Sequence, residues 1–240
     1  MKRFLLPAAC LLLLMATSCG GEQKNLSAVE SCLKDVAAEF GKKAPDMETA
    51  MLNHKYDAAR KFAECYVDLE DQYAEKTFLI NNHEVEYLIS EGDIDKAKST
   101  AQALGSDYLY EKALAAEVNQ LIKKEKFDAA INILSTWPFV VEFYPDGGKV
   151  YAEDEAVYGY PANNEGYNQE ITSYNDLVDN VINGMLMNKR LNRRNGKTMV
   201  KVCNLYVETA VKDESGNWTR ENSYKELALQ KLEDAGIRVD

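Results

Sequence analysis

Side chains that could catalyse a reaction are few in this sequence. The only histidines are His54 and His83, and neither lies at a spacing typical of metal ligands. The acidic run Glu153–Glu155 offers paired carboxylates, as glycosidases use, and with Asp146 it offers oxygen ligands for a calcium ion. Adjacent acidic residues more often form a solvated surface, and the alternating spacing of a calcium loop is missing. We therefore expect no enzyme activity, no cofactor and no metal site.

A cluster of tyrosines could bind a ligand rather than react with one. Tyrosine offers amphipathic contact area at a low entropic cost, which suits recognition of proteins or sugars. The same residues could instead pack their segment onto neighbouring helices and leave their hydroxyls in water. The candidate ligand-binding residues are Tyr144, Tyr151, Tyr158, Tyr160 and Tyr167, and Asn163, Asn164 and Asn168 lie among them.

A cluster of basic residues stands out in an otherwise acidic chain. Cations near the end of a helix complement its dipole, and that structural role could account for the whole cluster. The alternative is a docking patch for an anionic partner. The candidate docking residues are Lys189, Arg190, Arg193, Arg194 and Lys197.

The overall charge excludes some classes of partner. The 240-residue chain carries 28 basic and 39 acidic residues, a formal net charge of −11. Such a surface repels nucleic acid and anionic lipid headgroups, so we expect no nucleic-acid partner. A hydrophobic content of 46% indicates a folded body rather than a disordered tail.

The N-terminus has the layout of an export signal. A basic segment, Met1–Arg3, precedes an apolar run, Phe4–Met15, which is shorter than the roughly 20 residues that a helix needs to span a bilayer. Three small residues, 16–18, then precede Cys19. This layout resembles the lipobox of bacterial lipoproteins. The resemblance implies that residues 1–18 are a cleaved signal peptide, that Cys19 is lipidated, and that the membrane is a partner. An ordinary secretory signal is the alternative.

The same resemblance gives an expected location for the chain. Residues 19–25 are polar and would form a short tether between the lipid and the fold. Gly20 follows Cys19, in the place where an Asp retains some lipoproteins at the inner membrane. We therefore expect a lipid-anchored protein of the cell envelope, at the outer membrane of a Gram-negative bacterium.

Three cysteines remain once Cys10 is lost with the signal and Cys19 carries the lipid. Because Cys32, Cys65 and Cys203 are odd in number, they cannot all pair within the chain. In an exported protein Cys32 and Cys65 are the candidate bridge, since both fall on neighbouring predicted helices. We favour the alternative, that they are free buried thiols behaving as small hydrophobic side chains.

A short phrase recurs three times and predicts the fold. The phrase is an apolar or aromatic residue, Asp, one variable residue and Ala, and its aspartates lie 38 and then 33 residues apart. Each copy follows another segment with helical periodicity, which predicts pairs of antiparallel helices. We expect each Asp to accept backbone N–H bonds at the start of its helix. The three copies are Tyr56-Asp57-Ala58-Ala59, Ile94-Asp95-Lys96-Ala97 and Phe127-Asp128-Ala129-Ala130.

Residues 45–140 resemble the tetratricopeptide repeat family. The residues that carry the likeness are "GDIDKA" at 92–97, with looser copies "HKYDAA" at 54–59 and "EKFDAA" at 125–130. The resemblance implies stacked helical hairpins, a concave surface that binds a protein or peptide, and no catalysis.

The remaining segments complete the predicted organisation. Residues 26–138 are predicted as helical-hairpin repeats. A β-hairpin and a Tyr/Asn-rich loop are predicted at 139–168, as an insertion that covers roughly residues 139–165. Residues 169–240 are predicted as C-terminal helices packing on the array. Residues 198–212 fit a helical face better, although their β-branched content favours a strand. The expected fold class is therefore mainly α, with stacked antiparallel hairpins.

These features favour binding over catalysis. We expect an exported, membrane-anchored lipoprotein that acts as a non-catalytic helical-repeat scaffold or binding protein for a protein or peptide partner. The alternative is a glycan-binding accessory lipoprotein of an outer-membrane uptake system.

Overall fold

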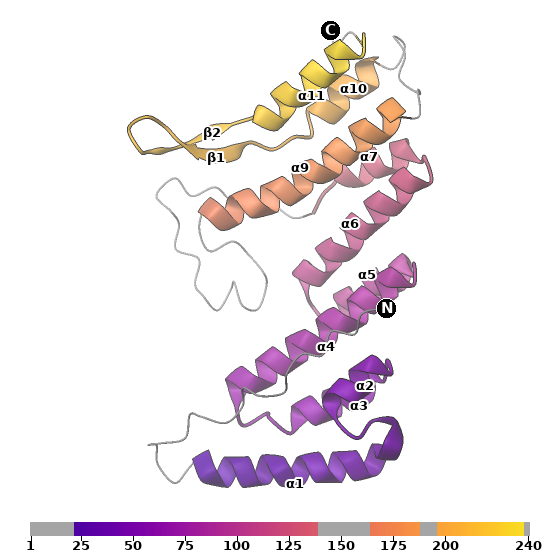
Figure 1. Cartoon of the computed structure of the whole chain (residues 1–240), viewed down its shortest axis with the longest axis vertical. Helices are drawn as coiled ribbons and strands as arrows, with labels where there is room; N and C mark the ends of the chain where they lie inside the picture. The colour runs from indigo at the N-terminus through magenta and orange to yellow at the C-terminus, as the bar shows by residue number, and fades with distance from the viewer. Residues whose placement is uncertain (1–21, 139–163, 188–195, 238–240) are drawn as a thin grey trace, which may run out of the picture. The chain divides into compact units, whose positions relative to one another are not determined.

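The computed structural model describes residues 22–138, 164–187 and 196–237 (Figure 1). The fold is mainly α-helical, as the sequence predicts, and the described part also contains one two-stranded antiparallel sheet. The chain divides into two compact units at the junction of residues 80 and 81. We describe each unit separately, as unit 1 and unit 2.

Unit 1 is a set of helices whose boundaries carry clear local signals. Gly41, with a φ of 61°, follows the first helix. Asp46 caps the next helix, because its side chain accepts a hydrogen bond from the Thr49 backbone N–H at 2.7 Å. Pro45 lies one residue before that cap. The elements are α1 (Glu22–Phe40), the 3₁₀ helix η1 (Gly41–Lys43), α2 (Met47–Leu52), α3 (Tyr56–Glu64) and the first part of α4 (Glu70–Ser90).

A disulfide bond joins α1 to the end of α3. Cys32 and Cys65 are bonded, with their Cα atoms 5.6 Å apart, and Cys65 is the C-terminal cap of α3. The expectation that these two residues are free thiols is wrong. Burial habits of cysteine favour a free thiol, but pairing depends on the distance between two Cα atoms that lie 33 residues apart in the sequence. The third cysteine, Cys203, is free and buried.

Unit 2 begins with the rest of α4 and continues as packed helical hairpins. Helix α6 packs against both α5 and α7, and α9 packs against α6, α7, α10 and α11. The elements are α5 (Ile94–Ala103), α6 (Asp107–Lys123), α7 (Phe127–Ser135), α9 (Asn164–Met187), α10 (Gly196–Cys203), β1 (Thr209–Lys212), β2 (Trp218–Glu221) and α11 (Ser223–Asp234).

The repeated phrase follows the same backbone turn in all three copies. His54, Gly92 and Glu125, each two residues before the apolar residue of the phrase, have positive φ angles of 55°, 79° and 56°. The next N–H donates to the carbonyl five residues back, at 2.8 Å for Lys55, 2.9 Å for Asp93 and 2.9 Å for Lys126. This is the Schellman ending of a helix, which only Gly adopts without steric cost.

The buried positions of the phrase also repeat. Its first residue is buried in each copy, and the alanine three residues later is fully buried. Because alanine has a single methyl group, it lets a neighbouring helix approach closely. The three alanines are Ala59, Ala97 and Ala130.

The aspartates of the phrase do not act as caps, contrary to the prediction. The capping residues are Lys55, Asp93 and Lys126, and none of them makes a side-chain capping bond. Each repeated Asp lies one position inside its helix, where it still favours the helix dipole. Asp57 lies 3.8 Å from Arg60, and Asp95 lies 3.4 Å from Lys98, so these carboxylates face the next turn instead.

Two apolar clusters are found among the described residues of unit 2. The smaller joins α4, α5 and α6 and is centred on Val85, Ala101 and Leu109. The larger joins α6, α7, α9, α10 and α11. Its fully buried members include Val118, Ala130, Val178, Val181, Ile182, Met199, Val202, Ala228 and Leu232.

Residues 198–212 are part helix and part strand. The favoured helix is correct only as far as Cys203, and β1 begins at Thr209. The side chain of Asn175, fully buried in α9, donates to the Val207 carbonyl at 2.9 Å and accepts from its N–H at 3.0 Å. Because these backbone groups bond to α9, the helix does not continue through them. Asp213 and Gly216 then form the turn between β1 and β2.

The predicted β-hairpin and loop at 139–168 lie mostly outside the described residues. The part at 164–168 is helical, because α9 begins at Asn164, and the predicted loop is wrong there. The described sheet is instead the β1–β2 hairpin, in which Ala210 pairs with Arg220 and Val211 with Thr219.

Candidate functional site

Most of the site residues predicted from the sequence lie outside the described part of the chain. For Tyr167, in α9, and Lys197, in α10, the backbone alone is described. The other predicted site residues, all outside the described ranges, are Cys19, Tyr144, Tyr151, Tyr158, Tyr160, Lys189, Arg190, Arg193 and Arg194.

The histidines do not form a metal site in the described ranges. His54 is exposed at the turn after α2, and its Nδ1 lies 3.2 Å from the Tyr56 hydroxyl. Within residues 22–138, 164–187 and 196–237, no three side chains of His, Cys, Asp or Glu gather closely enough to hold a metal ion.

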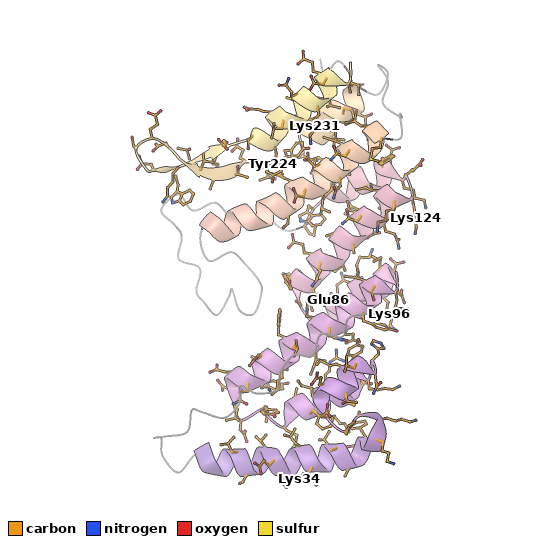
Figure 2. The ribbon with its side chains drawn as sticks, viewed as in Figure 1. Lys34, Glu86, Lys96, Lys124, Tyr224 and Lys231 are labelled. Carbon is orange, nitrogen blue, oxygen red and sulfur yellow. A yellow bond between two sulfur atoms is a disulfide. The ribbon has the colours of Figure 1, made fainter. Side chains whose placement is uncertain are left out.

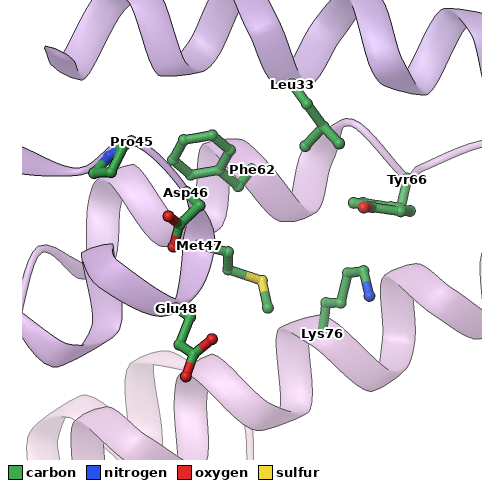
Figure 3. Close-up of a pocket in the computed structure, with 8 residues that line it drawn as sticks. All are labelled: Leu33, Pro45, Asp46, Met47, Glu48, Phe62, Tyr66 and Lys76. Carbon is green, nitrogen blue, oxygen red and sulfur yellow. The ribbon is translucent and has the colours of Figure 1, made fainter. Parts of the chain in front are cut away.

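Unit 1 contains a cavity of about 300 Å³ that the sequence did not reveal (Figure 3). Three elements supply its apolar wall: α1 through Leu33, α2 through Met47, and α3 through Phe62. Phe62 is 2% exposed and forms part of the fixed wall, whereas Met47 is half-buried and extends into the space. Lys34, next to Leu33, points away from α2 and α3 (Figure 2), so one face of α1 serves the cavity. We name this cavity the unit 1 pocket.

Charged groups of opposite sign lie at different ends of the unit 1 pocket. Asp46 and Glu48, at the start of α2, lie at one end, and Lys76 of α4 lies beside Tyr66 at the other (Figure 3). The Lys76 ammonium is 4.5 Å from the centroid of the Tyr66 ring, a cation–π distance. Glu48 is exposed and makes no ion pair or hydrogen bond with the residues that the structure describes. Pro45 completes the lining.

Each cysteine of the disulfide is adjacent in the sequence to a residue that lines the unit 1 pocket. Leu33 directly follows Cys32, and Tyr66 directly follows Cys65. The bond therefore limits how far α1 can move from the end of α3. A second restraint is the ion pair between Lys61 Nζ and Glu39 Oε1 at 2.6 Å. Glu39 raises the pKa of Lys61 by accepting its hydrogen bond and through its negative charge.

The composition of the unit 1 pocket resembles that of ligand pockets in general. Its wall is mainly apolar, and its charged groups lie at the ends, an arrangement that orients a ligand. Helical periodicity places Leu33 and Tyr66 on apolar faces, but it gives no reason to single out Met47 or Lys76. The available signal was the pair of cysteines, because each one directly precedes a residue of the wall.

A partly buried polar cluster in unit 2 connects the segment before β1, α9 and α11. The Tyr206 hydroxyl donates to Asp179 Oδ1, and Lys231 Nζ lies 3.3 Å from Asp179 Oδ2. Burial, followed by the hydrogen bond to Asp179, raises the pKa of Tyr206. Burial also raises the pKa of the Cys203 thiol, so this cysteine is a poor nucleophile at neutral pH. We interpret the cluster as structural.

The tyrosine and tryptophan that close the end of α7 are also structural. The Tyr174 hydroxyl donates to the Leu134 carbonyl at 3.0 Å, and Trp137 Nε1 donates to Glu111 at 3.1 Å. Their ring centroids are 5.6 Å apart. Burial raises the pKa of Tyr174 to about 12.

Comparison of the chain with known protein families, characterised proteins and solved structures finds no significant match. Among the helices described, none has the length and apolar content needed to cross a bilayer.

Proposed function

We propose that the chain is an exported lipoprotein, anchored through Cys19, whose helical hairpins bind a protein or peptide partner without catalysis. The observation that supports binding is the unit 1 pocket, an apolar cavity with charged ends that is lined by several helices. The recurring turn supports the repeat-like interpretation, because arrays of helical hairpins offer extended binding surfaces.

The proposed anchor rests on the N-terminal sequence. A basic start, a short apolar run and small residues before Cys19 fit a lipoprotein signal. Two or more acyl chains would give stable attachment, at about 0.8 kcal/mol for each buried methylene.

Metabolic labelling with a fatty acid tests the anchor. The wild-type chain should incorporate label and fractionate with the outer membrane, and Cys19→Ser should do neither. Cys10→Ser is the matched control, because Cys10 lies within the apolar run and should not affect labelling. Unchanged labelling of Cys19→Ser would refute the anchor while leaving partner binding open to its own test.

Crosslinking in intact cells tests partner binding. A photoreactive amino acid is placed at exposed positions of both units, for example Leu52, Val67 and Leu227, with Lys34 on the outer face of α1 for comparison. We expect a discrete adduct of defined mass from at least one face of the molecule. Absence of adducts at all positions, in cells that produce the chain in its normal compartment, would contradict the proposal.

The alternative is glycan binding by the Tyr144–Tyr167 cluster, which the density of tyrosines in that sequence favours. In that case oligosaccharides should quench tyrosine fluorescence, and Tyr158→Ala with Tyr160→Ala should abolish the effect. Under the main proposal, sugars leave the fluorescence unchanged.

A further inference from the structure

The unit 1 pocket is small. Its volume of about 300 Å³ lies at the lower limit of ligand pockets, which suits one anchoring group better than an oligosaccharide. Leu33, Met47 and Phe62 offer few hydrogen bonds, so the pocket favours an apolar or aromatic group over a sugar. Anchors of this kind contribute most of the affinity in many protein interfaces.

The charged residues at the ends of the pocket favour a particular charge on the ligand residue next to the anchoring side chain. Glu48 is exposed and has no partner among the described residues, so it is available to a cation. Asp46 adds a second carboxylate at the same end, although both its oxygens accept hydrogen bonds from Thr49. Lys76 repels a cation at the opposite end, beside Tyr66. The chain's net charge of −11 also favours a basic ligand.

We propose that the unit 1 pocket binds one long apolar or aromatic side chain of a peptide segment, with a basic neighbour of that residue facing Glu48. This inference rests on the proposed partner binding and names the chemistry of the partner. Opposite charges at the two ends give the bound segment one orientation. Because the Cys32–Cys65 bond directly precedes two residues of the wall, it also holds the pocket in its binding form.

Capped tripeptides test the anchor and the charge separately. The probes are Lys-Phe-Gly, Gln-Phe-Gly and Glu-Phe-Gly. Acetylation and amidation remove the terminal charges, so the three peptides differ in one side chain, which is positive, neutral or negative. Titrations followed by NMR chemical shifts of the Met47 methyl should give the affinity order Lys, then Gln, then Glu. We expect about a tenfold range at low salt, which narrows as salt screens the charges. Equal affinities, or no binding of any probe, would overturn the proposal.

Matched variants assign the effect to single residues. Glu48→Gln should remove the preference for Lys-Phe-Gly and leave Gln-Phe-Gly binding unchanged. Glu70→Gln, an exposed change outside the pocket, should leave both the preference and the affinities unchanged. Met47→Gln lacks the reporting methyl group, so its binding is measured by isothermal titration calorimetry, and it should weaken all three probes at least fivefold. Leu52→Gln on the same helix should not, because Leu52 is 65% exposed. Cys32→Ser should weaken all three as well, with helical content checked by circular dichroism.

The remaining outcomes separate this inference from the proposed function. If Met47→Gln keeps the crosslinked partner in cells, the pocket proposal fails and partner binding stands. If no adduct forms with the wild-type chain, the proposed function itself fails. If indole binds as tightly as Lys-Phe-Gly and Glu48→Gln has no effect, the cavity accepts small apolar molecules and the peptide proposal is wrong.

Discussion

Units 1 and 2 both use helical hairpins, but different interactions hold them together. In unit 1 a disulfide and the Lys61–Glu39 ion pair connect α1 to α3, and the interior retains a cavity. In unit 2 two apolar clusters join the helices, and buried hydrogen bonds from Asn175 and Tyr206 fasten the hairpin.

The difference follows from how much apolar surface each unit can bury. A short chain segment buries a smaller share of its surface, so small units often depend on a crosslink. A crosslinked unit can keep an open pocket, because its shape does not depend on filling every space. Both units bury apolar side chains, and unit 1 also has a disulfide whose cysteines directly precede two residues that line its pocket.

Truncation of the unit 2 core should have the largest effect. Ile182 is fully buried in the larger cluster, so Ile182→Ala should lower the free energy of unfolding by about 4 kcal/mol. Both tryptophans, Trp137 and Trp218, belong to unit 2, so their fluorescence during urea unfolding measures this loss. Val36→Ala, a half-buried position of α1, is the comparison in unit 1 and should cost much less. Equal decreases in the free energy of unfolding for the two variants would mean that apolar packing stabilises both units to the same extent.

Loss of the disulfide should come second and affect unit 1. The bond closes a loop with a sequence separation of 33, so its removal should cost roughly 3 kcal/mol. Dithiothreitol should therefore speed amide hydrogen exchange in residues 22–80, while the tryptophan transition of unit 2 stays in place. The free Cys203 serves as the internal control, because reduction leaves it unchanged. A tryptophan transition that moves on reduction would contradict the division.

Alkaline pH should weaken unit 2 through two buried tyrosines. The pKa of Tyr174 is raised to about 12, and that of Tyr206 is raised further, so both stay protonated in the folded chain above pH 10. Unfolded tyrosines lose their protons near pH 10, so the stabilisation is complete below that pH and declines above it.

The expected decline is up to about 1.4 kcal/mol per pH unit for each tyrosine above pH 10. Tyr174→Phe and Tyr206→Phe should each reduce this slope, as measured by urea unfolding from pH 9 to 11.5. Tyr206→Phe should also cost about 1 kcal/mol at neutral pH, because Asp179 loses a donor. A slope unchanged in both variants would show that neither tyrosine resists ionisation.

A methyl group at Gly184 should have the smallest effect. A Cβ at this position would lie 2.9 Å from Cε1 of Phe127 and 3.1 Å from Cγ2 of Ile122. Overpacking costs about 1–3 kcal/mol, and alanine gains about 1 kcal/mol of helix propensity. Gly184→Ala should therefore destabilise unit 2 by roughly 1 kcal/mol, whereas Asn183→Ala, an exposed neighbour, should not. Stabilisation by Gly184→Ala would mean that α9 packs less closely than the structure shows.

Predictions based on local sequence succeeded for helices and their turns. The apolar spacing of Val178, Val181 and Ile182 predicted a helix, and all three are fully buried in α9. Asp213 and Gly216 form the turn between β1 and β2, because Asp and Gly suit such turns through their own chemistry.

Predictions that depend on distant residues failed. The helix predicted through residue 212 was wrong because Asn175, more than thirty residues earlier, binds the backbone of Val207. The Cys32–Cys65 disulfide was named as the candidate bridge but not favoured, for the same reason. Of the eight residues of the unit 1 pocket, none was predicted as a site.

The amino-acid sequence by itself determined the helical hairpins and their repeated turn, because periodicity and backbone conformation act over a few residues. It also determined the acidic charge. The tertiary structure alone decided that Cys32 meets Cys65, that the chain leaves the helix after Cys203, and that Leu33, Met47 and Tyr66 surround one cavity. Each of these outcomes depends on a distance between residues far apart in the chain, and helical periodicity carries no information about such distances.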